Sequence, residues 1–179
     1  MTDARLPVEG QLVRLRDLTL NDAELVDWLN EQRDIGGFND FGQPIGRTPR
    51  DVLARGPLRN EYNGTLIVER LDHTPVGTVQ WRAVHYGPPD DSRAWNIGID
   101  LVPAARGHGY GSEAQRLLAA WLFASTNANR VEAQTDTDNL PEQHALEKAG
   151  FTREGVNRGS QFRGGAYHDL VIYSRLRSD

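Results

Sequence analysis

The feature that most constrains the fold of this chain is a stretch that runs from a strand pattern through alternate glycines into a helix pattern. Residues 95–101 alternate apolar and polar side chains, which is typical of a half-buried strand. Glycines occupy every second position over residues 107–111. Apolar side chains then recur at the spacing of one helix face over residues 112–126. Because a further strand pattern follows at 131–135, the stretch predicts a parallel strand–helix–strand crossover.

The remaining segments predict a mixed α/β (α+β) architecture. Successive strand patterns lead up to residue 101 with short turns between them, so we expect an antiparallel meander there. Residues 31–63 show no clear period, and we expect loops and short helices in that segment. A single domain over residues 1–179 is expected, with helices on both faces of one sheet. The other predicted strands are at 13–15, 65–68, 76–85, 170–176 and from Phe151 onward, and the other predicted helices begin near Asn21 and Pro141.

Composition excludes several classes of protein. The chain has 179 residues and no cysteine, which rules out disulfide scaffolds, cysteine-based zinc sites and a thiol nucleophile. No apolar run approaches the ~18 residues of a membrane span, and the start of the chain lacks the apolar core of a secretory signal. We therefore expect a cytoplasmic protein without a membrane partner. The formal net charge of −5 argues against a general nucleic-acid surface.

The glycine loop and the helix behind it predict an anion-binding site. Glycine lets a ligand approach the backbone closely, and a helix N-terminus presents unpaired N–H groups at the positive end of its dipole. Such a site suits phosphate, and Arg106 would add a cation at its mouth. A Walker A loop needs a lysine that is absent here, and the third glycine comes one residue too early for a dinucleotide fingerprint. A nucleotide-binding protein and a purely structural glycine-rich turn stay open as alternatives.

The motifs of this region resemble those of a known family. Arg106-x-x-Gly109-x-Gly111 is similar to the acyl-coenzyme A pyrophosphate loop of the Gcn5-related N-acetyltransferase (GNAT) superfamily. The resemblance is strongest to the branch that contains ribosomal-protein N-terminal (alanine) acetyltransferases, and it covers nearly the whole chain. The order and spacing of the motifs carry it, rather than any one of them. The other motifs are Val13-Arg14-Leu15-Arg16, residues 107–114, residues 129–133, Asn139, residues 146–151, Glu154-Gly155 and Tyr167-His168-Asp169.

The resemblance implies an acyl-coenzyme A-dependent N-acyltransferase that uses acetyl-coenzyme A, or another acyl-coenzyme A, as co-substrate. It implies a GNAT-type, mostly antiparallel sheet of about six or seven strands. In such a sheet the strands at 95–101 and 131–135 splay apart, and the pantetheine arm lies between them. Asn139 would contact this arm, although its place before Pro141 also fits a helix cap. The residues implied to bind the coenzyme are Leu101, Val102, Arg106, Gly107, His108, Gly109, Tyr110, Gly111, Ser112 and Asn139.

The catalytic groups do not follow the family's pattern. The branch often has serine three residues after its asparagine, where this chain has Glu142, and Asn96 and Gln161 stand where other members carry an acid. With no cysteine and no Gly-x-Ser-x-Gly motif, direct attack of a neutral amine in a ternary complex is favoured over a covalent enzyme intermediate. Each catalytic candidate also fits a structural role: in a first helix turn, on an outward strand face, at the surface or as a hydrogen-bond partner, and in the core. In that order, the candidates are Glu142, Asp100, His168 and Tyr173.

The acceptor is expected to be a primary amine, either a protein N-terminus or a small molecule. Aromatic and acidic residues over 28–63 would suit such an amine, or would simply cover the core. No metal is expected, since Asp136, Asp138 and His144 lack a ligand spacing. A homodimer is plausible by resemblance. The missing family acids keep a second function open, an acyl-coenzyme A-binding regulatory or interaction module with little catalysis.

Overall fold

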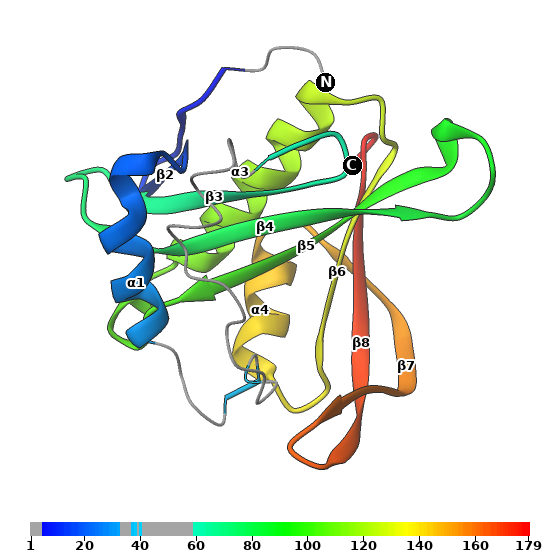
Figure 1. The fold of residues 1–179 in the computed structure, drawn as a ribbon. Coiled ribbons are helices and arrows are strands. Elements are labelled where there is room, and N and C mark those ends of the chain that lie inside the picture. Colours follow the sequence, from blue (N-terminus) through cyan, green and yellow to red (C-terminus); the bar gives the residue numbers. More distant parts are fainter. Residues whose placement is uncertain (1–4, 33–36, 39, 41–58) are drawn as a thin grey trace.

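The computed structural model describes residues 5–32, 37–38, 40 and 59–179 (Figure 1). In chain order, the strands and helices are β1 (Val8–Glu9), β2 (Val13–Asp17), α1 (Ala23–Glu31), β3 (Asn63–Arg70), β4 (Pro75–His85), β5 (Arg93–Leu101), α3 (Tyr110–Ser125), β6 (Arg130–Asp136), α4 (Leu140–Lys148), β7 (Thr152–Arg163) and β8 (Ala166–Leu176). Short 3-10 helices lie at Leu20–Asp22, Asp90–Ser92 and Pro103–Ala105. None of the helices in these residues has the length and apolarity that a membrane crossing requires. Most of segment 31–63, where the sequence predicts loops and short helices, lies outside the described residues.

The strands form one sheet in the order β1-β2-β3-β4-β5-β6-β8-β7. Every neighbouring pair is antiparallel except β5 and β6, which run parallel. The crossover between these two strands contains α3, as the sequence predicts. The described sheet therefore has one strand more than the sequence pattern indicates. The additional strand is β1, whose two residues are too few to produce an alternating pattern.

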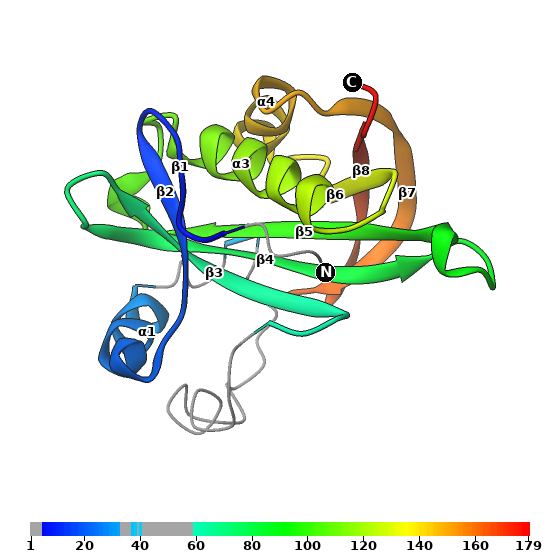
Figure 2. The same ribbon diagram turned by 90° about the horizontal axis from the view of Figure 1, so that it is seen from above.

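Helices cover both faces of the sheet, as expected. Figure 2 shows α3 and α4 on one face and α1 on the other. The apolar face predicted for α3 is buried in full, at Ala114, Leu117, Leu118, Trp121 and Leu122. Trp121 meets Trp81 of β4 edge to face, with ring centroids 5.2 Å apart. Burial of each large apolar side chain contributes about 1.5–3 kcal/mol, so this face holds α3 firmly on the sheet.

The parallel pair of β5 and β6 opens partway along its length. The two strands pair only over residues 95–97 of β5 and 131–133 of β6. Beyond this point β5 continues along β4 to Leu101, and β6 continues along β8 to Asp136. Figure 1 shows the two strands diverging. The splayed strand pair is therefore present, and the fold expected from the resemblance is confirmed.

Candidate active site

The predicted anion loop lies between β5 and α3. Gly107 and Gly109 have φ values of 78° and 83°, in the left-handed region that other residues adopt only with strain. α3 begins at Tyr110, directly after Gly109, and glycine has no side chain with which to cap the first turn. The loop is exposed, so the N–H groups at the start of α3 are accessible to an anion.

Two side chains of the loop border this helix N-terminus. Arg106 Nε donates a hydrogen bond to the Leu101 carbonyl at 3.3 Å, so its guanidinium folds back over the end of β5. The ring of His108 stacks on that of Tyr110, with centroids 5.5 Å apart. Arg106 and His108 are both exposed. The predicted cation is therefore at the mouth of the loop, and His108 is a neighbour of the predicted anion site.

The residues before the loop are held by the sheet. Leu101 is the last residue of β5 and pairs with Gly77 of β4. The Val102 N–H donates to the Val76 carbonyl at 3.0 Å, so this group is already bonded within the protein. A Cβ atom at Gly111 would lie 3.5 Å from Leu101 Cδ1, which places the first turn of α3 directly beside the end of β5.

Glu113 anchors this turn to the start of the chain. Its carboxylate accepts backbone hydrogen bonds from Gln11 at 2.8 Å, from Leu12 at 2.6 Å and from Val13 at 2.8 Å. Burial works to raise the pKa of Glu113, but these three N–H donors outweigh it and the pKa is lowered. Gly10 permits the approach, because a Cβ atom there would lie only 2.5 Å from Glu113 Cδ. The turn between β1 and β2 therefore packs against the anion loop.

A cleft of about 100 Å³ lies where β5 and β6 part. Glu142 of α4 and Asn139, the N-cap residue of that helix, border the cleft from the face of the sheet that α3 and α4 cover. Gln80 lies across Gly98, where a Cβ atom would be only 3.1 Å from the Gln80 Nε2 atom. The lining consists of Gln80, Ile97, Gly98, Ile99, Ala133, Gln134, Thr135, Asn139 and Glu142. The opening between the strands is therefore a real cavity bordered by polar side chains.

Asn139 directs its side chain back to β6. Its Nδ2 donates to Thr135 Oγ1 at 2.9 Å, and its side chain makes no capping hydrogen bond to the helix. Asn139 is nevertheless the N-cap residue of α4, as the alternative interpretation expects, and only the side-chain capping bond is missing. The bond to Thr135 takes the place of the cap and keeps the amide in the cleft lining, where the resemblance expects it.

Glu142 is the ionisable residue of the cleft lining. It lies in the first turn of α4, as one of the sequence interpretations predicts. Burial raises the pKa of its carboxyl, a hydrogen bond with Gln115 lowers it and the charge of Asp100 raises it further, to a value of about 7. Part of the residue's surface remains accessible, because the cleft opens to solvent. Near neutral pH the group can therefore both hold and release a proton.

The other three catalytic candidates lie outside this lining. Asp100 is exposed on β5, and its charge acts on Glu142. His168 lies 3.2 Å from Asp136 Oδ2 through Nδ1 and 3.2 Å from the Arg163 carbonyl through Nε2. Tyr173 is completely buried in β8, and its hydroxyl donates to Glu147 Oε1 at 3.0 Å. His168 and Tyr173 are thus engaged in structural contacts, which are the alternative roles that the sequence left open for them.

Three glutamine side chains at or beside the cleft are not predicted from the sequence as site residues. Gln80 and Gln134 line it from β4 and β6, and Gln115 of α3 is completely buried beside Glu142. Gln80 and Gln134 stand at the polar positions of alternating strands, where a solvent-facing side chain is the ordinary interpretation. Only the splay of β5 and β6 brings them to a cavity. Gln115 lies inside a predicted helix whose buried face the sequence indicates only through its apolar residues.

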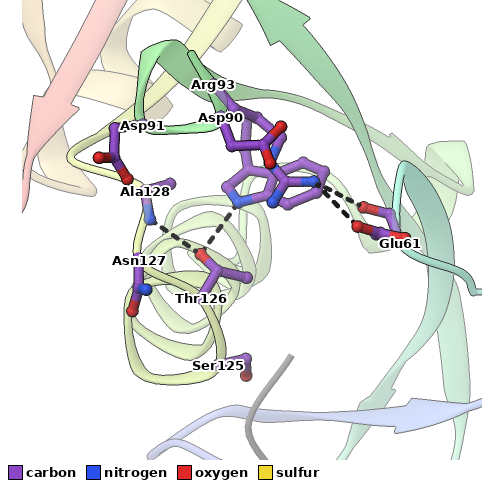
Figure 3. Close-up of a pocket in the computed structure, with 9 residues that line it drawn as sticks. Glu61, Asp90, Asp91, Arg93, Ser125, Thr126, Asn127 and Ala128 are labelled. Atoms are coloured by element: carbon purple, nitrogen blue, oxygen red, sulfur yellow. Dashed lines mark hydrogen bonds and ion pairs between the residues drawn. The ribbon is translucent and has the colours of Figure 1, made fainter.

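A larger cavity of about 310 Å³ lies at the opposite end of β5 (Figure 3). It is bordered by Arg93 at the start of that strand and by residues 125–128, which are the last residue of α3 and the three that follow it. Figure 3 shows Arg93 directed at Glu61, and the Trp95 Nε1 atom donates to Thr126 Oγ1 at 3.1 Å. These four polar side chains of the lining thus pair with one another. Because the anion loop lies at the other end of β5, this cavity is separate from the candidate active site.

A helix N-terminus behind a glycine loop, beside a parallel strand pair that opens into a polar cleft, is the arrangement that the resemblance implies for the class of acyl-coenzyme A N-acyltransferases. The chain belongs to the GNAT acetyltransferase family, because the family model described as "Acetyltransferase (GNAT) domain" matches residues 13–152. Enzymes of this family transfer acetyl groups from acetyl-coenzyme A to amines, and this protein is an N-acetyltransferase. The recognition made from the motifs is thereby confirmed, and the transferase interpretation is favoured over the nucleotide-binding alternative.

Individual relatives agree with this assignment. The chain is 35% identical to the probable N-acetyltransferase YjcK of Bacillus subtilis, and the match covers 96% of this chain and 98% of that protein. Among solved structures, the ribosomal-protein-S5-alanine acetyltransferase of Vibrio fischeri has a TM-score of 0.81 at 18% identity, covering 98% of each chain. RimJ of Mycobacterium smegmatis, solved in complex with CoA-disulfide, has a TM-score of 0.76 at 20% identity, covering 94% of this chain and 87% of RimJ. At these identities the two structures show a shared fold.

Proposed function

We propose that this enzyme transfers an acetyl group from acetyl-coenzyme A to a primary amine by direct attack in a ternary complex, with Glu142 as the acid that protonates the leaving sulfur. The amine is either a protein N-terminus or a small molecule. The observation that carries the proposal is the position of Glu142 in the cleft between the splayed strands. Both reactants would meet in that cleft.

The residues present fit the coenzyme. The turn from Gly107 to Ser112, exposed at residues 107–109 and half-buried beyond them, offers main-chain N–H groups at a helix N-terminus, which suits a diphosphate. Arg106 adds a positive charge at its edge. The separation of β6 from β5 beyond Ile97 leaves a channel in which the pantetheine arm would take the place of a neighbouring strand. The amide of Asn139 borders that channel.

The chain's own groups supply three contributions to the reaction. When bound, acetyl-coenzyme A supplies the activated thioester. Main-chain N–H groups near Gly98 would hold the carbonyl oxygen as charge develops on it. The Glu142 carboxyl would hold a proton and release it to the leaving sulfur, which a carboxyl with a pKa of about 7 can do near neutral pH. Asp100, whose charge already acts on Glu142, is the candidate to take the proton of the incoming amine through water.

The surroundings of the cleft support a polar, amine-bearing acceptor. The amides of Gln80 and Gln134 line it together with the carboxyl of Glu142, so hydrogen-bond acceptors are available for an amino group. Phe38 lies near the end of β7, where its ring packs under the Arg163 guanidinium at 5.3 Å. Asp34 and Phe41, which the sequence suggests for the acceptor site, lie outside the described residues. Homodimer formation stays a prediction from the resemblance.

A thiol-release assay tests the proposal. Acetyl-coenzyme A is incubated with the enzyme and with two amine panels, short peptides with free N-termini and linear polyamines, and released coenzyme A is measured. We expect turnover with at least one panel and a loss of about 10²-fold in kcat for Glu142→Gln. A matched control is Glu147→Gln on the same helix, which should keep kcat near that of the parent. Undiminished turnover in Glu142→Gln would refute the acid role, and coenzyme binding without turnover on any amine would favour a binding module.

A further inference from the structure

Gln115 is an unusual residue for the buried side of α3. It is completely inaccessible to solvent, and the neighbouring buried positions Leu118 and Leu122 are apolar. A primary amide in such a place costs free energy unless its donors and acceptor are bonded. A leucine or methionine would fill the same space without that cost, so the amide needs an explanation.

The contacts of Gln115 point toward the cleft. Its Nε2 donates to the carbonyl of Gly111, in the first turn of α3, at 3.3 Å. The amide also hydrogen-bonds the carboxyl of Glu142 on α4. Within the described residues, its Oε1 atom has no hydrogen-bond partner. The Gly111 carbonyl fixes the orientation of the amide, because only the NH2 group can donate to it. One NH2 group is thus shared between the anion loop and the proposed acid.

We propose that Gln115 is a positioning residue: its buried amide holds the Glu142 carboxyl in the cleft and ties it to the turn that is expected to bind the coenzyme's diphosphate. This inference rests on the proposed function, in which Glu142 acts on the leaving sulfur. Because its Oε1 atom has no hydrogen-bond partner within the described residues, the Gln115 amide is held through its NH2 group.

Few charged groups compete with Gln115 for Glu142. Within the described lining of the cleft, Glu142 is the ionisable residue, and Gln80, Gln134 and Asn139 are neutral amides. The charge of Asp100 on β5 acts on Glu142 from outside this lining and disfavours its ionised form. Gln115 is thus the group in contact with the carboxyl that favours the ionised form. Its removal should therefore be visible in the titration of Glu142 itself.

The first test follows Glu142 without turnover. In the full-length protein labelled with ¹³C at glutamate carboxyls, the Glu142 signal is assigned by its loss in Glu142→Gln and followed by NMR through a pH titration. Gln115→Met, which is similar in length but has no donor, should raise the midpoint by about one pH unit. Gln115→Asn, which keeps an amide but is too short to bridge both partners, should raise it in the same direction and serves if the methionine variant does not fold. Unchanged midpoints would overturn the inference.

The matched control is Ser125→Ala. Ser125 is also buried on α3, and its Oγ donates to the Trp121 carbonyl at 2.7 Å, the same spacing along the helix as the Gln115 bond to Gly111. This variant removes a similar internal hydrogen bond far from the cleft. It should leave the Glu142 midpoint where it is in the parent protein. An equal shift in Ser125→Ala would mean that the midpoint reports general loosening of α3, and would overturn the positioning role.

A kinetic cycle adds a second requirement. Gln115→Met should lower kcat about 10-fold while the KM for acetyl-coenzyme A stays within about twofold. In the Glu142→Gln background the same substitution should cause no further loss, because Gln115 acts through Glu142. Additive losses would overturn the inference. If the midpoint shifts but Glu142→Gln retains full kcat, the acid role fails and the contact stands; if the midpoint is fixed while Glu142→Gln is slow, the acid role stands and this inference fails.

Discussion

The carboxylate of Glu113 accepts a hydrogen bond from the backbone N–H of Leu12 at 2.6 Å, and this contact joins the start of α3 to the turn between β1 and β2. The Leu12 side chain in turn borders the anion loop, since a Cβ atom at Gly109 would lie 3.3 Å from Leu12 Cδ1. The loop is therefore buttressed by the N-terminal hairpin. The conformation of the loop thus depends on Glu113, a residue that takes no part in the proposed reaction.

Replacing this carboxylate should weaken both the fold and coenzyme binding. Glu113→Ala leaves three buried or partly buried N–H groups without their acceptor, and we expect a loss of about 2–3 kcal/mol in the free energy of unfolding. Calorimetry should show weaker coenzyme A binding because the loop loses its support. Arg116→Ala removes the partner of Glu113 at 3.5 Å and is the control, since exposed ion pairs contribute less than about 1 kcal/mol. Equal stabilities of Glu113→Ala and Arg116→Ala would contradict this account.

The Glu113 contacts also predict that the free energy of unfolding decreases at acidic pH. The folded pKa of Glu113 lies below the usual value of 4.5, so its contribution is present above pH 4.5 and is lost as the pH falls through the folded value. The slope of unfolding free energy against pH below 4.5 should therefore be smaller in Glu113→Ala than in the parent. Urea denaturation at a series of acidic pH values measures that slope. An identical slope in both proteins would show that other carboxylates carry the acid sensitivity.

A comparison of two glycines with left-handed backbone conformation distinguishes the effect of backbone strain from an effect on ligand binding. Gly109 in the anion loop and Gly165 in the turn between β7 and β8 have φ values of 83° and 85°. Alanine at either site should cost about 1 kcal/mol of stability through the same strain. Only Gly109→Ala should also weaken coenzyme A binding, by about tenfold or more, because its methyl group enters the turn that offers N–H groups to the diphosphate. Calorimetric titration of both variants decides, and equal affinities would count against the loop as the diphosphate site.

Local patterns account for the parts of the fold that the sequence predicts. The burial of α3 follows from the spacing of Leu118, Trp121 and Leu122, which share one helix face. The splay of β5 and β6 has no such local signal and was expected only from the resemblance carried by the loop motif. β1 escapes prediction because two residues show no period. Pattern and family motif together thus place the sheet, the crossover helix and the coenzyme loop.

Contacts between residues distant in the chain account for what sequence reasoning misses. Glu113 is about a hundred positions from the three N–H donors that it binds, and no period in the sequence connects them. Gln115 is adjacent to the cleft only because α4 folds back onto α3. His168 of β8 lies near Arg163 because β8 pairs with β7, and near Asp136 because β8 also pairs with β6. Such pairings depend on the three-dimensional register of the strands, which single-sequence patterns do not determine.

The burial of Tyr173 predicts a structural effect without a catalytic one. Tyr173→Phe removes only the hydroxyl that donates to Glu147, and we expect a loss of about 1 kcal/mol in unfolding free energy. The kcat for acetyl transfer should stay within about twofold of the parent, because the hydroxyl is engaged on α4 outside the cleft lining. Thermal unfolding and the thiol-release assay on one protein preparation test both statements. A large drop in kcat with intact stability would return Tyr173 to the catalytic candidates.

The raised pKa of Glu142 predicts that replacing this residue increases the stability of the protein at alkaline pH and decreases its activity. Its folded pKa of about 7 exceeds the usual 4.5, so its neutral form is favoured by folding, and the resulting stability is present below pH 4.5 and lost as the pH rises through 7. Glu142→Gln has no carboxyl to ionise in the cleft, so it should become more stable than the parent at pH 8 while losing about 10²-fold in kcat.

In the parent, kcat should fall as the pH rises above about 7 because Glu142 loses its proton, and this fall should be absent from Glu142→Gln. Urea denaturation at pH 5 and 8, together with pH profiles of kcat, measures both effects. A glutamine variant that is less stable than the parent at pH 8 would mean that the carboxylate is well paired in the cleft, and would remove the physical basis for a protonated Glu142 at neutral pH.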